Sequence, residues 1–131
     1  MTHTNHLGVP GARLFYTVSG SGPVLLVAQG GAQDADGAQL LAEELSDFTV
    51  VSWDRRGLSR STVEPGEPAL ALSVHAEDAR RILDAVSPGT PAYVFGSSIG
   101  ALIALDLLTR WPERVRRLVA HEPPIAALLD P

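Results

Sequence analysis

A serine between two glycines is the residue of this sequence best suited to nucleophilic chemistry. Ser98 is the central residue of Gly96-Ser97-Ser98-Ile99-Gly100, which follows a short apolar run and precedes a longer apolar segment. A sharp turn from a strand into a helix would lift the Ser98 hydroxyl above the end of a sheet, and the glycines would let that turn pass close to neighbouring backbone. We therefore interpret Ser98 as a nucleophile for a carbonyl carbon and Ser97 as a packing neighbour. An ordinary turn rich in small residues is the alternative.

Attack by a serine on a carbonyl creates an oxyanion, which needs backbone N–H donors. The amide of Ile99, at the start of the expected helix, would provide one donor together with the helix dipole. Gln29-Gly30-Gly31-Ala32 follows an earlier apolar run, and the loop after such a central strand usually supplies the second donor. We expect Gly31 to be that donor and Gly30 to form the turn, whereas a plain glycine turn is the alternative.

Short apolar runs alternate with longer amphipathic patterns along the chain, and this alternation predicts a mostly parallel sheet covered by helices on both faces. The expected fold class is therefore α/β, a three-layer α/β/α sandwich. Strands are expected at residues 12–19, 24–28, 48–53, 92–95 and 115–121, and helices at 38–45, 73–86 and 99–110. The intervening residues 54–72 predict a long loop, and loops of this length are often functional.

Length and composition indicate one globular unit. The 131 residues fit a single domain with a buried core, and 45% of them are hydrophobic while 19% are charged. The net charge of -5, with arginines scattered among acids, argues against nucleic acid and anionic membrane as partners. No apolar run approaches the roughly 18 residues of a membrane span. The first residues lack the basic and apolar regions of an export signal, so a cytoplasmic location is expected.

The chain has no cysteine, which excludes disulfides and thiolate metal sites. The remaining pattern implies neither a metal nor a cofactor. Three histidines are assigned to no site, because His3 and His6 lie in a start that we expect to be mobile and His75 is expected to face outward from its helix. Asp54 and Arg55 open the long loop and could line a site, but we interpret them as a structural ion pair, since such pairs are common and mostly passive.

In the order and spacing of these segments, residues 12–124 resemble the first half of an α/β-hydrolase of the small, cofactor-free esterase, peptidase and haloperoxidase-like group. That family carries Asp-x-x-Gly-x-Gly-x-Ser after the strand that follows the oxyanion loop. Residues 54–61, Asp-Arg-Arg-Gly-Leu-Ser-Arg-Ser, match this pattern with Ser59 in place of a glycine. Gln29 stands where the family usually has a histidine. That histidine supports loop geometry more than chemistry, so we expect Gln29 to affect substrate choice more than mechanism.

The resemblance also implies which catalytic groups this sequence provides. The family's chain order is nucleophile, acid and then histidine, which comes from a loop after the last strand, and we expect that strand to lie outside this sequence. Glu122 is the candidate acid, as in the subgroup that carries its carboxylate after the strand next to the nucleophile strand. The alternative is that Glu122 caps the Pro-Pro turn. His121 is expected to line the pocket rather than act as the base, because a base must reach the nucleophile by a hydrogen bond.

A sheet that stops after residues 115–121 would expose a central strand edge and several apolar helix faces, which natural proteins avoid. We therefore predict that residues 1–131 are the N-terminal portion of one α/β-hydrolase domain, truncated before the lid and the last strands. The C-terminal half, as a second chain, is expected to complete the sheet and donate the histidine, and activity is expected only once it is present. The expected function is serine hydrolysis of a small ester or acyl substrate. Two alternatives stay open: a non-hydrolytic relative, such as a lyase, cyclase or cofactor-free haloperoxidase, and an inactive binding protein.

Overall fold

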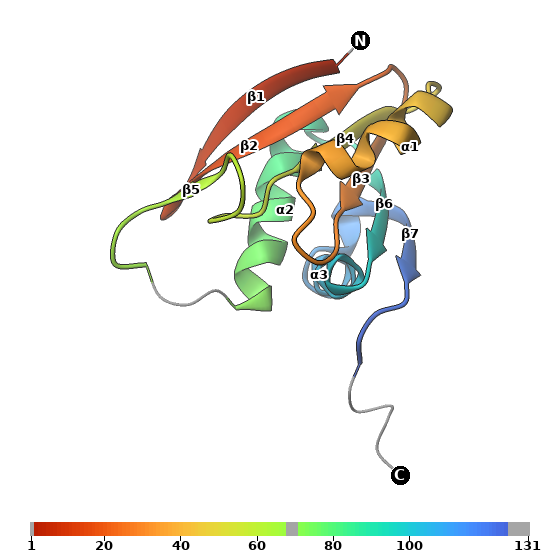
Figure 1. Ribbon diagram of the computed structural model, residues 1–131. Helices are drawn as coiled ribbons and strands as arrows, with labels where there is room; N and C mark the ends of the chain where they lie inside the picture. The colour runs from red at the N-terminus through yellow and green to blue at the C-terminus, as the bar shows by residue number, and fades with distance from the viewer. Residues whose placement is uncertain (1, 68–70, 126–131) are drawn as a thin grey trace.

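The computed structural model describes residues 2–67 and 71–125, and Figure 1 shows how their elements are arranged. The strands are β1 (Thr2–Val9), β2 (Ala12–Ser19), β3 (Val24–Ala28), β4 (Thr49–Trp53), β5 (Thr62–Val63), β6 (Ala92–Ser97) and β7 (Val115–His121). The helices are α1 (Gln39–Glu44), α2 (Leu72–Val86) and α3 (Ile99–Arg110), with the short 3₁₀ helices η1 (Ala35–Ala38) and η2 (Pro112–Arg114). Every predicted strand and helix is present, with small shifts of its ends.

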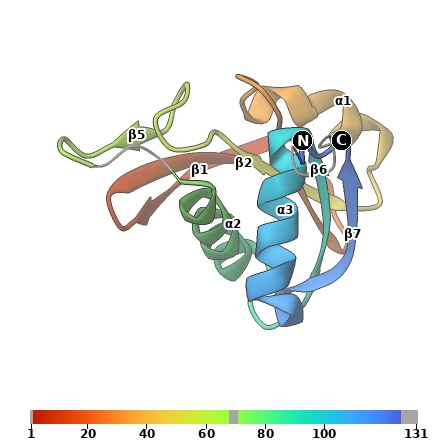
Figure 2. The same ribbon diagram turned by 90° about the horizontal axis from the view of Figure 1, so that it is seen from below.

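The described strands form one mixed sheet. Their order is β1-β2-β4-β3-β6-β7, with β5 paired to β2. The part from β4 through β3 and β6 to β7 is parallel, whereas β1 and β2 run antiparallel to their neighbours. Helices α2 and α3 lie side by side on one face of the sheet and α1 lies on the other (Figure 2). The predicted α/β class and its three-layer arrangement are therefore confirmed.

Helices on both faces bury the central strands. The last four residues of β3 and of β4 are buried, as expected for continuous apolar strands between two helix layers. The larger core cluster lies between the sheet and helices α2 and α3, where Leu26, Val51, Ile82 and Leu107 are 0% exposed. A smaller cluster packs beneath α1 and includes Ala42 of that helix. The carboxyl ends of the central strands are thus held in fixed positions.

Strands β1 and β5 are absent from the sequence prediction. β1 pairs with β2 along its whole length, and the His6 ring contacts the Phe15 ring edge-on with centroids 5.3 Å apart. The expected mobile start around His3 and His6 is therefore wrong. Most β1 side chains are exposed, so the strand lacks the alternating apolar pattern that predicts strands. β5 lies within the predicted loop 54–72, of which residues 68–70 fall outside the described residues.

A buried carboxylate holds the loop after β4. Asp54 is 0% exposed and accepts hydrogen bonds from the backbone N–H groups of Ala35 and Arg60 at 2.8 and 2.9 Å. The Arg60 guanidinium adds two more, at 2.8 and 3.0 Å. Burial alone would raise the pKa of Asp54, but these hydrogen bonds and the charge of Arg60 bring it below its ordinary value. The ion pair expected between Asp54 and Arg55 is therefore wrong, because Arg60 is the partner of Asp54.

A second buried ion pair joins the same loop to α2. The Arg56 guanidinium donates to both carboxylate oxygens of Asp78 at 2.7 Å, and the two residues are 5% and 0% exposed. Arg56 also donates to the carbonyl of Pro10 at 3.0 Å. The start of the loop is thereby fixed both to α2 and to the turn between β1 and β2.

Replacing Asp78 by alanine is expected to lower the free energy of unfolding by about 3–5 kcal/mol, because Arg56 would stay buried without its counter-ion. Asp84→Ala is the matched control, since the Asp84 side chain is 47% exposed where it pairs with Arg80 and Arg114. Surface pairs of this kind contribute about 0–1 kcal/mol. Urea unfolding of the protein, followed by circular dichroism, measures both variants. Equal losses would contradict the anchoring role of the Arg56–Asp78 pair.

Candidate active site

The turn between β6 and α3 gives Ser98 an unusual backbone conformation. Ser98 has φ of 56° and ψ of -124°, a positive-φ region that residues other than glycine rarely occupy. Strain of this kind costs about 1–3 kcal/mol and persists where the surrounding structure enforces it. The Ser98 N–H donates to the carbonyl of His121 at 2.9 Å, and the residue is exposed. The predicted strand–turn–helix is therefore present, with Ser98 at the carboxyl edge of the sheet.

The two glycines of this turn sit where any side chain would collide with backbone. A Cβ added to Gly96 would lie 2.3 Å from the carbonyl oxygen of Gly100. A Cβ added to Gly100 would lie 2.1 Å from the carbonyl oxygen of Ala28, at the end of β3. Real Cβ atoms do not approach so closely, so both glycines are required for α3 to start directly against the ends of β3 and β6.

The loop after β3 lies against the same turn. A Cβ on Gly30 would come within 2.7 Å of the Ser97 carbonyl oxygen and 3.0 Å of Ser98 Cβ. Gly31 has φ of 56° and no atom within 4 Å of its Cβ position, so conformation rather than space favours glycine there. Ile99 begins α3, and the N–H of the first residue in a helix has no acceptor within that helix. Gly31 directly follows Gly30, and Ile99 directly follows Ser98, so the two candidate donors come from the two segments that meet at this contact.

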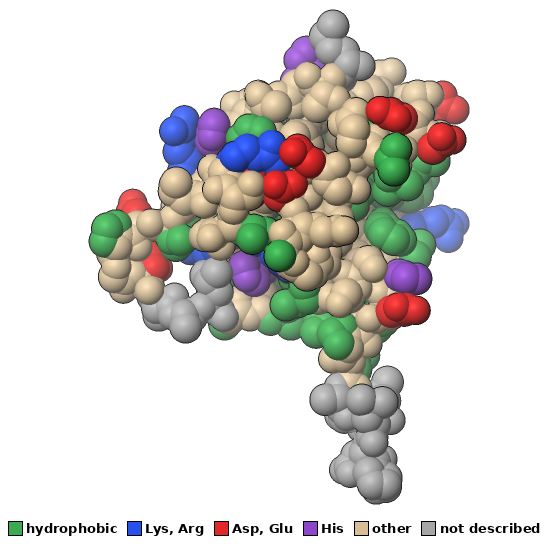
Figure 3. All heavy atoms as spheres, viewed as in Figure 1, with side chains coloured by type: hydrophobic (Ala, Val, Ile, Leu, Met, Phe, Trp, Pro, Cys, Tyr) green, Lys and Arg blue, Asp and Glu red, His purple; other side chains and the backbone are tan. Residues whose placement is uncertain are grey.

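The carboxyl end of β7 lies beside this turn as well. His121 is opposite Ser97 in the parallel pairing of β6 with β7, and its Nδ1 lies 3.1 Å from the Ser97 hydroxyl oxygen. Glu122 follows with φ of 50°. Both residues are exposed, and Figure 3 shows histidine and acidic side chains at the surface near the end of β7. His121 thus contacts the neighbour of Ser98, and within residues 2–67 and 71–125 no side chain hydrogen-bonds to the Ser98 hydroxyl.

Arg55 contacts the loop after β3 instead of Asp54. One of its terminal nitrogens donates to the carbonyl of Gln29 at 3.4 Å, and the other donates to the carbonyl of Gly31. Burial lowers the pKa of Arg55. The sequence pattern does not predict this contact, because only the parallel pairing of β3 with β4 brings the two loops together. The contact could have been predicted from that pairing, because the carboxyl ends of neighbouring parallel strands meet at one edge of a sheet.

His75 was expected to face outward from α2 and is instead partly buried, so that expectation is wrong. Its Nδ1 is buried and has no hydrogen-bond partner among the described residues. Burial lowers the pKa of His75, and the charges of Arg55 and Arg56 lower it further, against an opposing effect of Asp78. These surroundings therefore favour the uncharged form of the ring.

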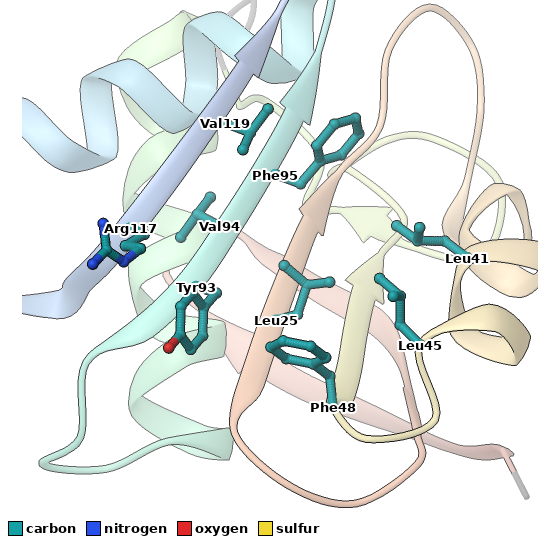
Figure 4. Close-up of a pocket in the computed structure, with 9 residues that line it drawn as sticks. All are labelled: Leu25, Leu41, Leu45, Phe48, Tyr93, Val94, Phe95, Arg117 and Val119. Atoms are coloured by element: carbon teal, nitrogen blue, oxygen red, sulfur yellow. The ribbon is translucent and has the colours of Figure 1, made fainter.

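An apolar groove opens on the face of the sheet that carries α1 (Figure 4). Its volume is about 290 Å³. It is lined by Leu25, Leu41, Leu45, Phe48, Tyr93, Val94, Phe95, Arg117 and Val119. Val119, on β7, is 58% exposed. Monomeric proteins usually cover large apolar surfaces of this kind with another element or a partner.

The described part of the chain contains no cluster of three or more histidine, aspartate or glutamate side chains that could hold a metal ion. None of the helices described within residues 2–67 and 71–125 is long and apolar enough to cross a membrane. The described residues at this edge of the sheet present an exposed serine, Ser98, at the start of α3.

Comparison with known proteins connects this geometry to a family. Residues 23–131 match the family model for the alpha/beta hydrolase fold. The chain is 46% identical to the uncharacterized hydrolase YraK of Bacillus subtilis (strain 168) over 124 residues, which cover 94% of this chain and 45% of that protein. It is 33% identical to a zearalenone hydrolase of Bionectria ochroleuca over 127 residues, 92% of this chain and 46% of that protein. The crystal structure of an alpha/beta hydrolase from Sphaerobacter thermophilus DSM 20745 matches with a TM-score of 0.79 and 34% identity, over 93% of this chain and 45% of that one.

The sheet order and the glycine-flanked serine turn are features of a hydrolase fold. The chain belongs to the α/β-hydrolase family, and the resemblance inferred from its motifs is confirmed. It spans about half the length of the relatives it matches.

Replacing Gly100 by alanine is expected to lower the free energy of unfolding by about 1–3 kcal/mol, because the new methyl group would force α3 away from the Ala28 carbonyl. Gly8→Ala is the matched control, since no atom lies within 4 Å of the Cβ position at Gly8 on β1. Thermal and urea unfolding of both variants measure the difference. An undisturbed Gly100 variant would show that α3 does not start in contact with β3.

Proposed function

We propose that this chain supplies the nucleophile and the oxyanion donors of a serine hydrolase that cleaves a small ester or acyl substrate. The observation that carries the proposal is the positive φ of Ser98 between Gly96 and Gly100, neither of which has room for a Cβ atom. A serine held in this strained turn presents its hydroxyl at the carboxyl edge of the sheet, next to the first N–H of a helix. The hydrolase names of the relatives in the α/β-hydrolase family favour hydrolysis over lyase or cyclase chemistry.

In the proposed mechanism, Ser98 Oγ forms a bond to the substrate carbonyl carbon while its proton passes to a base. The negative charge that develops on the carbonyl oxygen is stabilised by the N–H groups of Ile99 and Gly31. The intermediate then expels its leaving group, which takes the proton from the base. Water next attacks the acyl group on Ser98 while the base accepts a proton from the water, and the base returns that proton to Ser98 Oγ as the acyl group leaves. These steps need no cofactor.

The base is proposed to be a histidine from the C-terminal half of the same fold. Two features of the described residues support this proposal: the apolar groove beside α1 is open, and β7 forms one edge of the sheet. Both relatives are more than twice as long as the segment that matches this chain. Strands and helices from that half would cover both surfaces and place a loop above Ser98.

Glu122 is proposed as the acid that orients this histidine, and His121 as a residue of the substrate pocket. His121 is the last residue of β7 and Glu122 follows it directly, and β7 pairs with β6 next to Ser98. Glu122 is exposed and has positive φ, so its position is set by the turn that ends the strand. His121 is held by the Ser97 hydroxyl through Nδ1, which leaves its other ring nitrogen available to a substrate.

A fluorophosphonate probe is expected to label Ser98 in the complete protein, because labelling requires a hydroxyl activated by a base. Ser98→Ala should abolish both labelling and ester turnover, whereas Ser97→Ala, the adjacent hydroxyl, should retain labelling. Residues 1–131 alone are expected to stay unlabelled. Mass spectrometry of the labelled peptide identifies the modified serine. A complete protein that takes up no probe would contradict the proposal and favour an inactive binding protein.

Replacing Glu122 by glutamine is expected to lower kcat by a factor on the order of 10⁴, since loss of a triad carboxylate leaves the histidine poorly oriented. Glu113→Gln is the matched control, because Glu113 is an exposed carboxylate on η2 at the other end of β7. Turnover of p-nitrophenyl acetate by the complete protein compares the two. Activity near that of the unchanged protein would favour a turn-capping role for Glu122.

A further inference from the structure

We propose that Arg55 is a positioning residue that fixes the peptide between Gly30 and Gly31, whose N–H is the candidate oxyanion donor. This inference rests on the proposed serine-hydrolase function. The Arg55 guanidinium donates to the carbonyls of Gln29 and Gly31. These carbonyls belong to the peptide groups directly before and directly after the one between Gly30 and Gly31.

Three consecutive carbonyls of this loop have fixed partners. Those of Gln29 and Gly31 accept from Arg55, and that of Gly30 accepts from the N–H of Gln33 at 3.1 Å. Because a trans peptide is planar, with its N–H opposite its C=O, fixing the Gly30 carbonyl also fixes the direction of the Gly31 N–H. Among the described residues, no group accepts a hydrogen bond from that N–H. The donor is therefore oriented and free to bind an oxyanion.

Packing holds Gly30 against the turn at Ser98 but leaves Gly31 without close neighbours. A pair of glycines has the most flexible backbone available to a protein, and no atom lies within 4 Å of the Cβ position of Gly31. A donor stabilises an oxyanion efficiently only when it is oriented before the reaction. The planar guanidinium can donate to two separate acceptors in a fixed geometry, whereas a lysine presents one flexible ammonium group. Arginine is thus the side chain suited to hold both carbonyls.

The charge of Arg55 differs from that of its neighbours in the same loop. Arg56 is paired with Asp78, and Arg60 is paired with Asp54 and Asp36. Arg55 forms no ion pair with any residue within 2–67 and 71–125. An uncompensated cation that holds the oxyanion loop would also favour the negative charge that develops during attack. The competing explanation is that Arg55 binds a carboxylate carried by the substrate.

The test compares Arg55→Ala and Arg55→Lys with the unchanged complete protein on two esters, p-nitrophenyl acetate and the carboxylate-bearing mono-p-nitrophenyl succinate. We expect Arg55→Ala to lower kcat by about 10- to 100-fold on both esters, less than the loss of a whole oxyanion donor, while KM changes less than about twofold. Arg55→Lys should recover part of the loss, and added guanidinium should partly restore Arg55→Ala. Arg13→Ala, which removes an exposed arginine from β2, is the matched control and should behave as the unchanged protein.

Hydrogen exchange provides a second measurement that does not depend on turnover. The peptide that contains residues 29–33 should exchange faster in Arg55→Ala and in Arg55→Lys, and at the original rate in Arg13→Ala. Unchanged exchange in this peptide would overturn the proposal. A rise in KM confined to the succinate ester would also overturn it and identify Arg55 as a receptor for a substrate carboxylate. Failure of the unchanged protein to label at Ser98 would instead count against the proposed function, and the exchange data would still decide whether Arg55 holds the loop.

Discussion

At the start of α3 the backbone of Gly100 lies so close to the end of β3 that an added Cβ would stand 2.1 Å from the Ala28 carbonyl oxygen. This contact sets how near the helix comes to the sheet, and it leaves the connection from β6 only one residue in which to change direction. The chain changes direction at Ser98, which has a positive φ. The same contact brings the start of α3 next to the loop that follows β3. The strained serine and its candidate donors therefore depend on two glycines that have no room for a side chain.

The segment from Asp54 to Ser61 holds the surroundings of this point in place through polar contacts. Asp54 binds the start of η1, Arg56 binds α2, and Arg55 binds the loop after β3. Ser61 accepts from the N–H of Phe15 in β2 and donates to the carbonyl of Asp54. Buried backbone groups need hydrogen-bond partners, and apart from the hydrogen bond from the Asp54 N–H to the Phe15 carbonyl of β2, residues 54–61 lack the regular ladder of a paired strand. Charged and hydroxyl side chains provide those partners here, so the segment is conformationally fixed although it contains little regular structure.

The sequence predicts the parallel core and the serine turn because both leave local signals. Apolar runs mark strands buried on two faces, and glycines around Ser98 mark a turn that approaches other backbone. β1 leaves no such signal, because its side chains are exposed and its stability comes from pairing with β2. The contact of Arg55 with Gln29 and the burial of His75 depend on which strands become neighbours. Such contacts follow from topology, which a local pattern does not encode.

Ser59 shows how one departure from the family pattern fits this arrangement. It stands where α/β-hydrolases resembling this chain carry a glycine, and its φ of 52° is a conformation that favours glycine. The Ser59 hydroxyl donates to a carboxylate oxygen of Asp34 at 2.8 Å. Asp34 in turn accepts from the N–H of Asp36 at the start of η1, and Arg60 lies near both acids. A glycine would relieve the backbone strain but remove this link between the loop after β4 and the loop after β3. The serine therefore has a strained backbone, but its hydroxyl links the loop after β3 to the loop after β4. The candidate oxyanion site depends on both loops.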